Sequence, residues 1–191
     1  MNTINHMNKQ KFEYSLNAML YCLWLFEQKS QNIISKIIRF LFSPVPKYFF
    51  TKKIKERYYE NKRKSKRQVN DFFNNKKNGL SIRMAYHNFG SLYSSFPCFI
   101  SFSLLGLILR IFKDINLGVL FMLFIIPITI FSIPMYKAVF SNDKYLEYFK
   151  QFEKKDEHWH KIWKWRTKAF IFGSITSFFL GIIMAFVIAM N

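Results

Sequence analysis

Three long apolar stretches separated by polar sequence dominate the chain. Residues 96–112 are apolar until Arg110, and residues 117–136 and 169–190 contain no charged side chain. A bilayer core about 30 Å thick is crossed by roughly 20 apolar helical residues. The second and third stretches meet that length directly, and the first meets it when it begins near Phe89. The pattern predicts an all-α integral membrane protein with transmembrane helices at about 89–112, 117–136 and 169–190.

A shorter apolar run, residues 16–26, leaves the number of spans open. It is too short to cross a bilayer alone. No small-residue cleavage site follows it, as a signal peptide would require. The alternative is a fourth, short or re-entrant span within residues 12–27.

Residues 33–42 have the period of an amphipathic helix. Lys36 and Arg39 lie opposite an apolar face formed by Ile33, Ile34, Ile37, Ile38, Leu41 and Phe42. Pro44 and Pro46 end the pattern. A basic amphipathic helix is suited to a membrane surface, and packing on a neighbouring helix is the alternative interpretation.

The charge is strongly positive and unevenly distributed. The 191 residues include 29 Lys and Arg against 11 Asp and Glu, a net charge of +18. Residues 1–88 hold 18 of the basic and 5 of the acidic residues, and residues 137–168 hold 9 and 5. The positive-inside rule places both regions on the cytoplasmic side, and we expect the membrane to be a bacterial inner membrane. This predicts a membrane-associated, basic helical region at 1–88 and a transmembrane bundle at 89–191 with a cytoplasmic loop at 137–168.

The densest basic run is residues 47–67, with ten Lys and Arg, two Glu and five interleaved aromatic residues. Such a segment attracts anionic lipid headgroups. It also suits RNA, or a nuclease with bound RNA, because phosphates contact the cations and bases stack on the aromatics. The residues assigned to this binding are Lys52, Lys53, Lys55, Arg57, Lys62, Arg63, Lys64, Lys66 and Arg67.

Small residues recur every four positions along the last apolar stretch. Ala169 begins a stripe that continues through Gly173, Ser177, Gly181, Ala185 and Ala189. Such stripes let another helix backbone approach closely. A homo-oligomer is the favoured interpretation, because three helices bury little surface among themselves. Packing against the chain's own first two spans is the alternative.

The middle stretch contains Pro127 and Pro134, seven residues apart, with Thr129 and Ser132 between them. Proline removes backbone hydrogen bonds and kinks a helix. Within a membrane, the freed carbonyl groups need partners such as nearby hydroxyls. The pair predicts a kink that is either a hinge or static.

Candidate chemistry outside the apolar stretches is sparse. Arg83 and His87 are similar to the Arg and His pair of helical ribonucleases, but three residues separate them where that pattern has four to six. Asp156 and His160 have the spacing of two metal ligands, without an evident third. The chain has two cysteines and no phosphate-binding glycine loop, and neither feature suggests a catalytic site. We therefore expect no enzyme activity, metal or cofactor.

Trp159, Trp163 and Trp165 directly precede the last apolar stretch. Tryptophans at this position are typical of an interfacial aromatic belt.

The overall plan, a short chain with a basic cytoplasmic part and several spans, resembles the small transmembrane accessory proteins of bacterial antiphage systems, including those of type VI-B CRISPR loci. That resemblance implies a protein that permeabilises the membrane or regulates a cytoplasmic RNA-guided nuclease. The resulting expectation is a non-enzymatic, self-associating membrane effector. A membrane anchor that recruits RNA or another anionic partner, and an immunity protein against a membrane-active toxin, are the alternatives.

Overall fold

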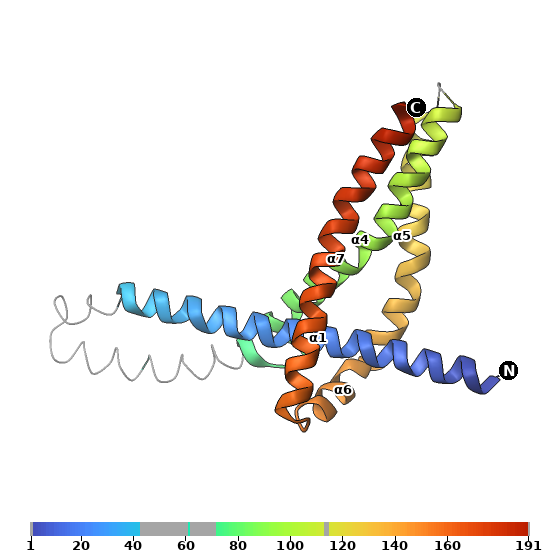
Figure 1. Cartoon of the computed structure of the whole chain (residues 1–191). Helices are drawn as coiled ribbons and strands as arrows, with labels where there is room; N and C mark the ends of the chain where they lie inside the picture. The colour runs from blue at the N-terminus through green and yellow to red at the C-terminus, as the bar shows by residue number, and fades with distance from the viewer. Residues whose placement is uncertain (1, 43–60, 62–71, 113–114, 191) are drawn as a thin grey trace. The chain divides into compact units, whose positions relative to one another are not determined.

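The computed structural model describes residues 2–42, 61, 72–112 and 115–190 (Figure 1). They form the helices α1 (Asn2–Phe42), α4 (Leu80–Ile111), α5 (Leu117–Val139), α6 (Lys144–Phe152) and α7 (Glu157–Met190). A short 3₁₀ helix, η1 (Ser141–Asp143), joins α5 to α6. These described residues include no strand, so the predicted all-α class is confirmed for this part of the chain.

Three helices of the described chain, α4, α5 and α7, are long and apolar enough to cross a membrane. This confirms the three predicted apolar segments, although α4 and α7 extend well beyond them. Residues 137–168, expected as a loop, are largely helical. Asp156 explains the early start of α7, because its side chain accepts a hydrogen bond from the Trp159 amide at 3.1 Å and caps the helix. The run 16–26 lies within α1, which is not among these three helices.

The chain divides into two compact units, and α1 and α4 each contribute to both. We call residues 1–22 and 88–191 the bundle unit, and residues 23–87 the hairpin unit. The bundle unit contains most of α4 and the whole of α5, α6 and α7.

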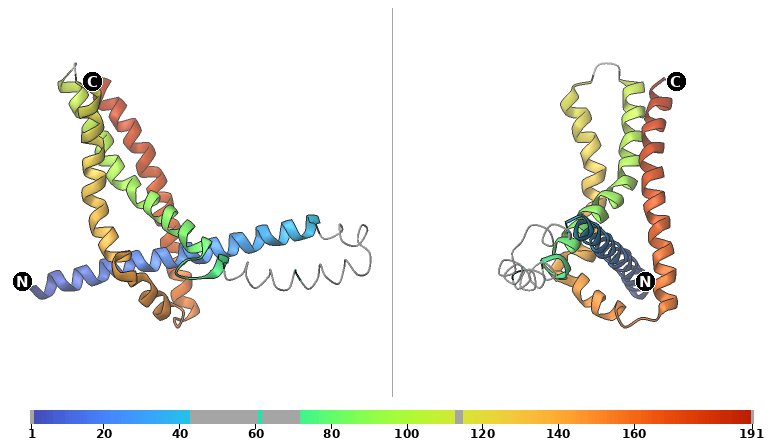
Figure 2. Two further views of the ribbon diagram at one scale, coloured as in Figure 1. Left: turned by 180° about the vertical axis from the view of Figure 1, so that it is seen from behind. Right: turned by 90° about the vertical axis from the view of Figure 1, so that its left-hand side faces the viewer.

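Helices α4 and α7 lie side by side in the bundle unit, as the views of Figure 2 show. Glycines bring the two backbones together at two levels. A Cβ atom on Gly106 would lie 2.7 Å from the Ala185 carbonyl oxygen, and one on Gly181 would lie 2.9 Å from the Phe99 Cα. Phe102 and Phe178 add a contact at 5.8 Å between ring centroids. Close backbone approach at small residues is the usual way in which helices associate in a membrane.

The first half of α1 crosses the bundle unit at the end where α5 finishes and α7 begins (Figures 1 and 2). We call this end, formed by α1 residues 13–22, the end of α5, α6 and the start of α7, the base. Many of its side chains are deeply buried, including Leu20, Val139, Phe149 and Phe152, each with no exposed surface. Many side chains of α5 are exposed by contrast, such as Phe121 and Met122.

A tight turn redirects the chain from α5 into α6. Asn142 and Asp143 both adopt left-handed backbone conformations, with φ angles of 57° and 54°. Asn and Asp tolerate this region better than other non-glycine residues because their short polar side chains bond locally. The turn allows α6 to pack with the other helices of the base.

The glycine contacts give the first prediction. Gly181→Ala and Gly106→Ala should each destabilise the fold by about 1–3 kcal/mol, because the new methyl group meets backbone that has no room to move. Gly173→Ala is the matched control on the same stripe, since its Cβ would meet only the Phe96 ring, at 3.8 Å. Alanine should there be neutral or stabilising by up to about 1 kcal/mol through helix propensity.

Thermal unfolding of the full chain in detergent measures these effects. Equal behaviour of the Gly181 and Gly173 variants would contradict the close contact of α4 and α7.

Candidate functional site

Aromatic side chains from three helices form the centre of the base. Tyr14 of α1 packs edge-on against Phe152 of α6 at 5.1 Å and against Trp163 of α7 at 5.8 Å. Tyr21 contacts Phe149 at 5.1 Å, also edge-on. Phe152 stacks on Trp159 at 4.8 Å. Such ring pairs add about 0.5–1.5 kcal/mol each beyond the apolar area that they bury, so the base is a well-packed core.

Polar contacts fix α1 on this core. The Trp159 indole donates a hydrogen bond to the Tyr14 hydroxyl at 2.9 Å. The Lys144 ammonium lies 3.2 Å from both carboxylate oxygens of Glu13, and the Tyr148 hydroxyl donates to Glu13 at 3.3 Å. Sequence reasoning missed these residues, because their partners lie far along the chain.

Asn17 provides the most buried polar contact of the base. Its side chain has no exposed surface and donates to the carbonyl oxygens of Glu13 at 2.8 Å and Ala138 at 3.0 Å. The second bond joins α1 to the last turn of α5, where carbonyl groups have no partner within the helix. A polar residue inside the apolar run 16–26 was the available sequence signal.

Two tyrosine hydroxyls and one cysteine thiol of the base have raised pKa values. Burial raises the pKa of Tyr21 to about 12, with a smaller contribution from Glu153. Burial also raises the pKa of Tyr148, and Glu13 adds to the effect. The pKa of Cys22 is raised by burial despite opposing effects of Thr167 and Lys164. These groups are neutral near pH 7, so Cys22 is not an activated nucleophile.

The described basic residues of the bundle unit gather at the base or on the turn of α1 just before it, and among them only Arg110 lies on another part of the unit. They are exposed or half-buried: Lys9, Lys11, Lys137, Lys144, Lys150, Lys154, Lys155, Lys161, Lys164, Arg166 and Lys168. Two of them lie over tryptophan rings, Arg166 at 4.8 Å from Trp163 and Lys168 at 4.7 Å from Trp165. The unit therefore has one strongly basic end.

The predicted aromatic belt is wrong for two of its three tryptophans. Trp163 is buried and Trp159 is half-buried in the aromatic core, because they lie on the face of α7 that meets α1 and α6. Trp165 points elsewhere and is 64% exposed.

Part of the stripe of small residues on α7 contacts α4 of the same chain. Gly181 is buried against Phe99, and Ala185 contacts Gly106. Gly173 and Ser177 are half-buried, and Ala189 is exposed. The alternative interpretation, packing on the chain's own spans, describes Gly181 and Ala185.

The two prolines of α5 have different surroundings, since Pro127 is buried and Pro134 is exposed. Near Pro127 the buried Ser101 hydroxyl of α4 donates to the Phe124 carbonyl oxygen at 2.8 Å. Thr129 and Ser132 instead donate to carbonyls of their own helix. A hydroxyl from a neighbouring helix thus supplies the kind of partner that a proline-disturbed helix needs. Pro97, inside α4, is a second such position that the sequence analysis did not single out.

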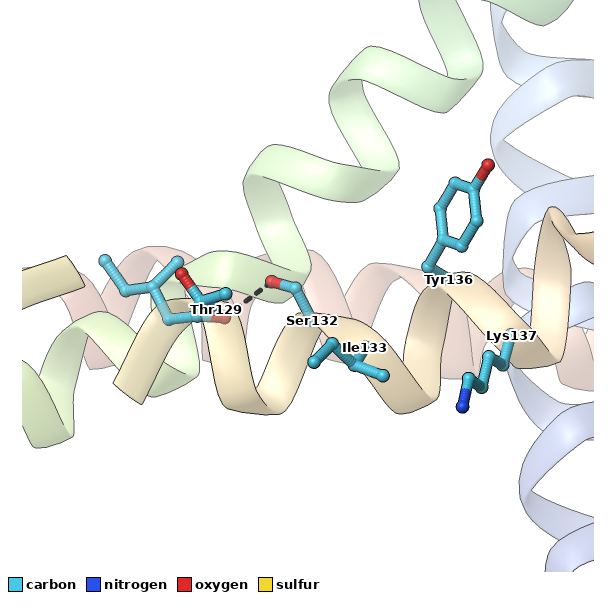
Figure 3. A pocket seen from close by; sticks show the side chains of 6 residues that line it. Thr129, Ser132, Ile133, Tyr136 and Lys137 are labelled. Carbon is cyan, nitrogen blue, oxygen red and sulfur yellow. Dashed lines mark hydrogen bonds between the residues drawn. The ribbon is translucent and has the colours of Figure 1, made fainter. Parts of the chain in front are cut away.

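A shallow hollow lies along α5 near Pro134 (Figure 3). Its volume is about 390 Å³. Only α5 lines it, through Ile128, Thr129, Ser132, Ile133, Tyr136 and Lys137. A hollow formed by one helix, without converging polar groups from other elements, does not have the form of a catalytic pocket.

The candidate catalytic and metal-binding pairs lie on single helices. Arg83 and His87 are exposed on α4. Asp156 caps α7, and His160 packs against Tyr21 and Trp159 at 5.9 and 5.1 Å. Within the described residues, no group of three or more His, Cys, Asp or Glu could hold a metal ion.

The hairpin unit includes described residues that precede and follow the basic segment in the chain. All nine basic residues assigned to anion binding, from Lys52 to Arg67, lie outside the described residues. On either side of them, the Ser81 hydroxyl of α4 donates to the Gln31 side chain of α1 at 2.9 Å, and Lys76 lies 6.0 Å from the Trp24 ring. Direct contacts on either side of the basic segment therefore join the two parts of the hairpin unit.

The apolar face predicted for residues 33–42 is exposed where its side chains are described. Ile33, Ile34 and Ile37 are all at least half exposed. The interpretation as a helix packed on a neighbour therefore does not apply to these side chains.

No family model matches the chain, and neither a curated protein nor a solved structure shows significant similarity to it.

The base gives the second prediction. Asn17→Ala should destabilise the fold by about 1–3 kcal/mol, because the buried Ala138 carbonyl oxygen loses its donor. Ser15→Ala is the matched control, since the Ser15 hydroxyl bonds only to the Lys11 carbonyl of its own helix. Thermal unfolding followed by tryptophan fluorescence would test this, and equal melting temperatures for the two variants would contradict the role of Asn17.

Proposed function

We propose that the protein is a non-enzymatic membrane anchor that holds its basic segment, residues 47–67, at a membrane surface, where the segment binds RNA. The observation that carries this proposal is that α1 and α4, the helices before and after that segment, contact each other. Gln31 and Ser81 join the two helices at 2.9 Å, and α4 continues from there into a candidate span. We infer that the chain tethers the basic segment to the span, because α4 is one continuous helix from Leu80 to Ile111.

The charge distribution of the bundle unit supports a defined orientation. Its described basic residues lie at the base or on the turn of α1 just before it, and Arg110 lies near the opposite end of α4. Cytoplasmic segments carry the excess of Lys and Arg in membrane proteins. In this orientation the base faces the cytoplasm, and the α4–α5 connection and the end of α7 face outward.

The chemistry of the basic segment supports RNA as the partner. Ten cations and five aromatic side chains supply phosphate contacts and stacking surfaces in one stretch. The RNA can arrive free or bound to a nuclease. Regulation of an RNA-guided nuclease in antiphage defence stays a prediction that depends on the resemblance in overall plan.

Self-association and permeabilisation of the membrane also stay predictions. Gly181 and Ala185 contact α4, so the small-residue stripe offers only its other members to a second copy. The mass of the purified protein in detergent, by light scattering, decides between a monomer and a closed oligomer.

The orientation gives the third prediction. In a chain with Cys22→Ser and Cys98→Ser, a cysteine at Leu117 should react with an impermeant maleimide on intact cells, because Leu117 is 81% exposed on the outer side. A cysteine at Lys154, in the turn before α7, should react only after lysis. The opposite pattern would invert the topology, and labelling of both on intact cells would contradict it.

RNA binding gives the fourth prediction. The full chain in nanodiscs of neutral lipid should bind fluorescent single-stranded RNA with a steep salt dependence, measured by anisotropy. Replacing Lys62, Arg63, Lys64, Lys66 and Arg67 with Gln should lower the salt slope by about 0.7 for each lost phosphate contact.

The control is a variant with the same change of charge outside the segment. It replaces the exposed residues Lys9, Lys11, Lys150, Lys154 and Lys155 with Gln. Equal weakening by both variants, or no binding in neutral nanodiscs, would rule out the basic segment as an RNA site.

A further inference from the structure

One exposed face of α7 combines cations, an indole and an apolar ring. Lys161, Trp165, Lys168 and Phe172 are spaced by four, three and four residues, which places them on one side of a helix. All four are exposed, Trp165 by 64% and Phe172 by 72%. We call these four residues the outer α7 face. The aromatic core of the base does not use it.

Lys168 has no acidic residue nearby on its own helix, and Lys161 has one, Glu157, four residues before it. After Glu157, α7 contains no Asp or Glu through Met190. The Lys168 ammonium lies 4.7 Å from the centroid of the Trp165 ring, a cation–π contact that holds the charge beside the indole. An exposed charge fixed in this way remains available to an anion.

The geometry points to the outer α7 face as a binding site for the phosphate of an anionic phospholipid. This inference rests on the proposed crossing of the membrane by α7. With a rise of about 1.5 Å per residue, Phe172 lies about 10 Å beyond Trp165 and about 16 Å beyond Lys161 along the helix axis. Lys161 and Lys168 bind the phosphate, Trp165 lies at the headgroup level between them, and Phe172 contacts the acyl chain.

The apolar end of the face favours a lipid over a nucleic acid. Phe172 lies inside the apolar stretch 169–190, where RNA phosphates would have to leave water. A phospholipid offers an anion and an apolar chain in the same order as the face. Charge and hydrophobicity therefore point to one occupant.

Quenching of Trp165 by brominated phospholipid tests the site in the full chain. The protein is placed in phosphatidylcholine bilayers that contain a small fraction of either brominated phosphatidylglycerol or brominated phosphatidylcholine. The signal of Trp165 is the difference from Trp165→Phe. At equal fractions, the anionic lipid should quench Trp165 more strongly. Its apparent affinity should fall about fivefold for each of Lys161→Gln and Lys168→Gln, as expected from the attraction of one basic group to anionic lipid.

The variant with Lys154→Gln and Lys155→Gln is the matched control, because both residues are exposed in the turn before α7 and lie off the face. It should keep the preference for the anionic lipid. Equal quenching by both lipids, or an equal loss of preference in the control, would overturn the site while leaving α7 in the membrane. Quenching by neither lipid would overturn both the site and the crossing of α7, and relief of quenching by added RNA would assign the face to nucleic acid.

Discussion

The hydrophobic effect stabilises this protein only where water would otherwise reach the side chains. Apolar side chains of a membrane span gain nothing by leaving lipid for one another, so in the proposed membrane orientation burial does not hold α4, α5 and α7 together. At the base, outside the three apolar stretches, burial can contribute: Phe149 and Phe152 have no exposed surface and Trp163 has 6%. Fully burying a side chain of this size contributes about 1.5–3 kcal/mol in water. The base is therefore the part of the bundle unit that orders the ends of α5 and α7.

Inside the apolar region, contacts of another kind must replace burial. Gly106 and Gly181 allow backbone contact between α4 and α7, and the Ser101 hydroxyl reaches the Phe124 carbonyl of α5 at 2.8 Å. A hydrogen bond between spans contributes about 1 kcal/mol or less, because the separated helices find other partners. Contact along the spans is thus specific and weak, and the base supplies the firmer connection.

The difference between these two regions explains what the sequence could predict. Uncharged stretches of about 20 residues are set by bilayer thickness, so the three apolar helices could be recognised from composition alone. The base could not, because its core joins residues as distant as Tyr14 and Trp163, and the start of α7 mixes aromatic and charged residues without a clear apolar period. The apolar period of α6, formed by Tyr145, Phe149 and Phe152, does not show which helix it meets. The prediction of an aromatic belt is wrong for Trp159 and Trp163 for the same reason. A lipid interface and a protein core both select aromatic rings, and only the placement of α1 distinguishes them. For the small-residue stripe, the sequence showed a helix contact without its partner, which for Gly181 and Ala185 is α4.

These interactions also bear on the choice between an anchor and a pore. A water-filled path needs polar groups that face it, yet Thr129 and Ser132 of α5 donate to carbonyls of their own helix. The stretches 117–136 and 169–190 contain no charged side chain to attract an ion or to hold water. Opening a path between α4 and α7 would first have to separate the glycine contacts that bring their backbones together. The charges of the bundle unit lie instead at or next to the base, on the helices that the aromatic core holds in place. These interactions support the proposed anchor, a fixed platform that would present charge at a membrane surface, over an assembly that opens the membrane.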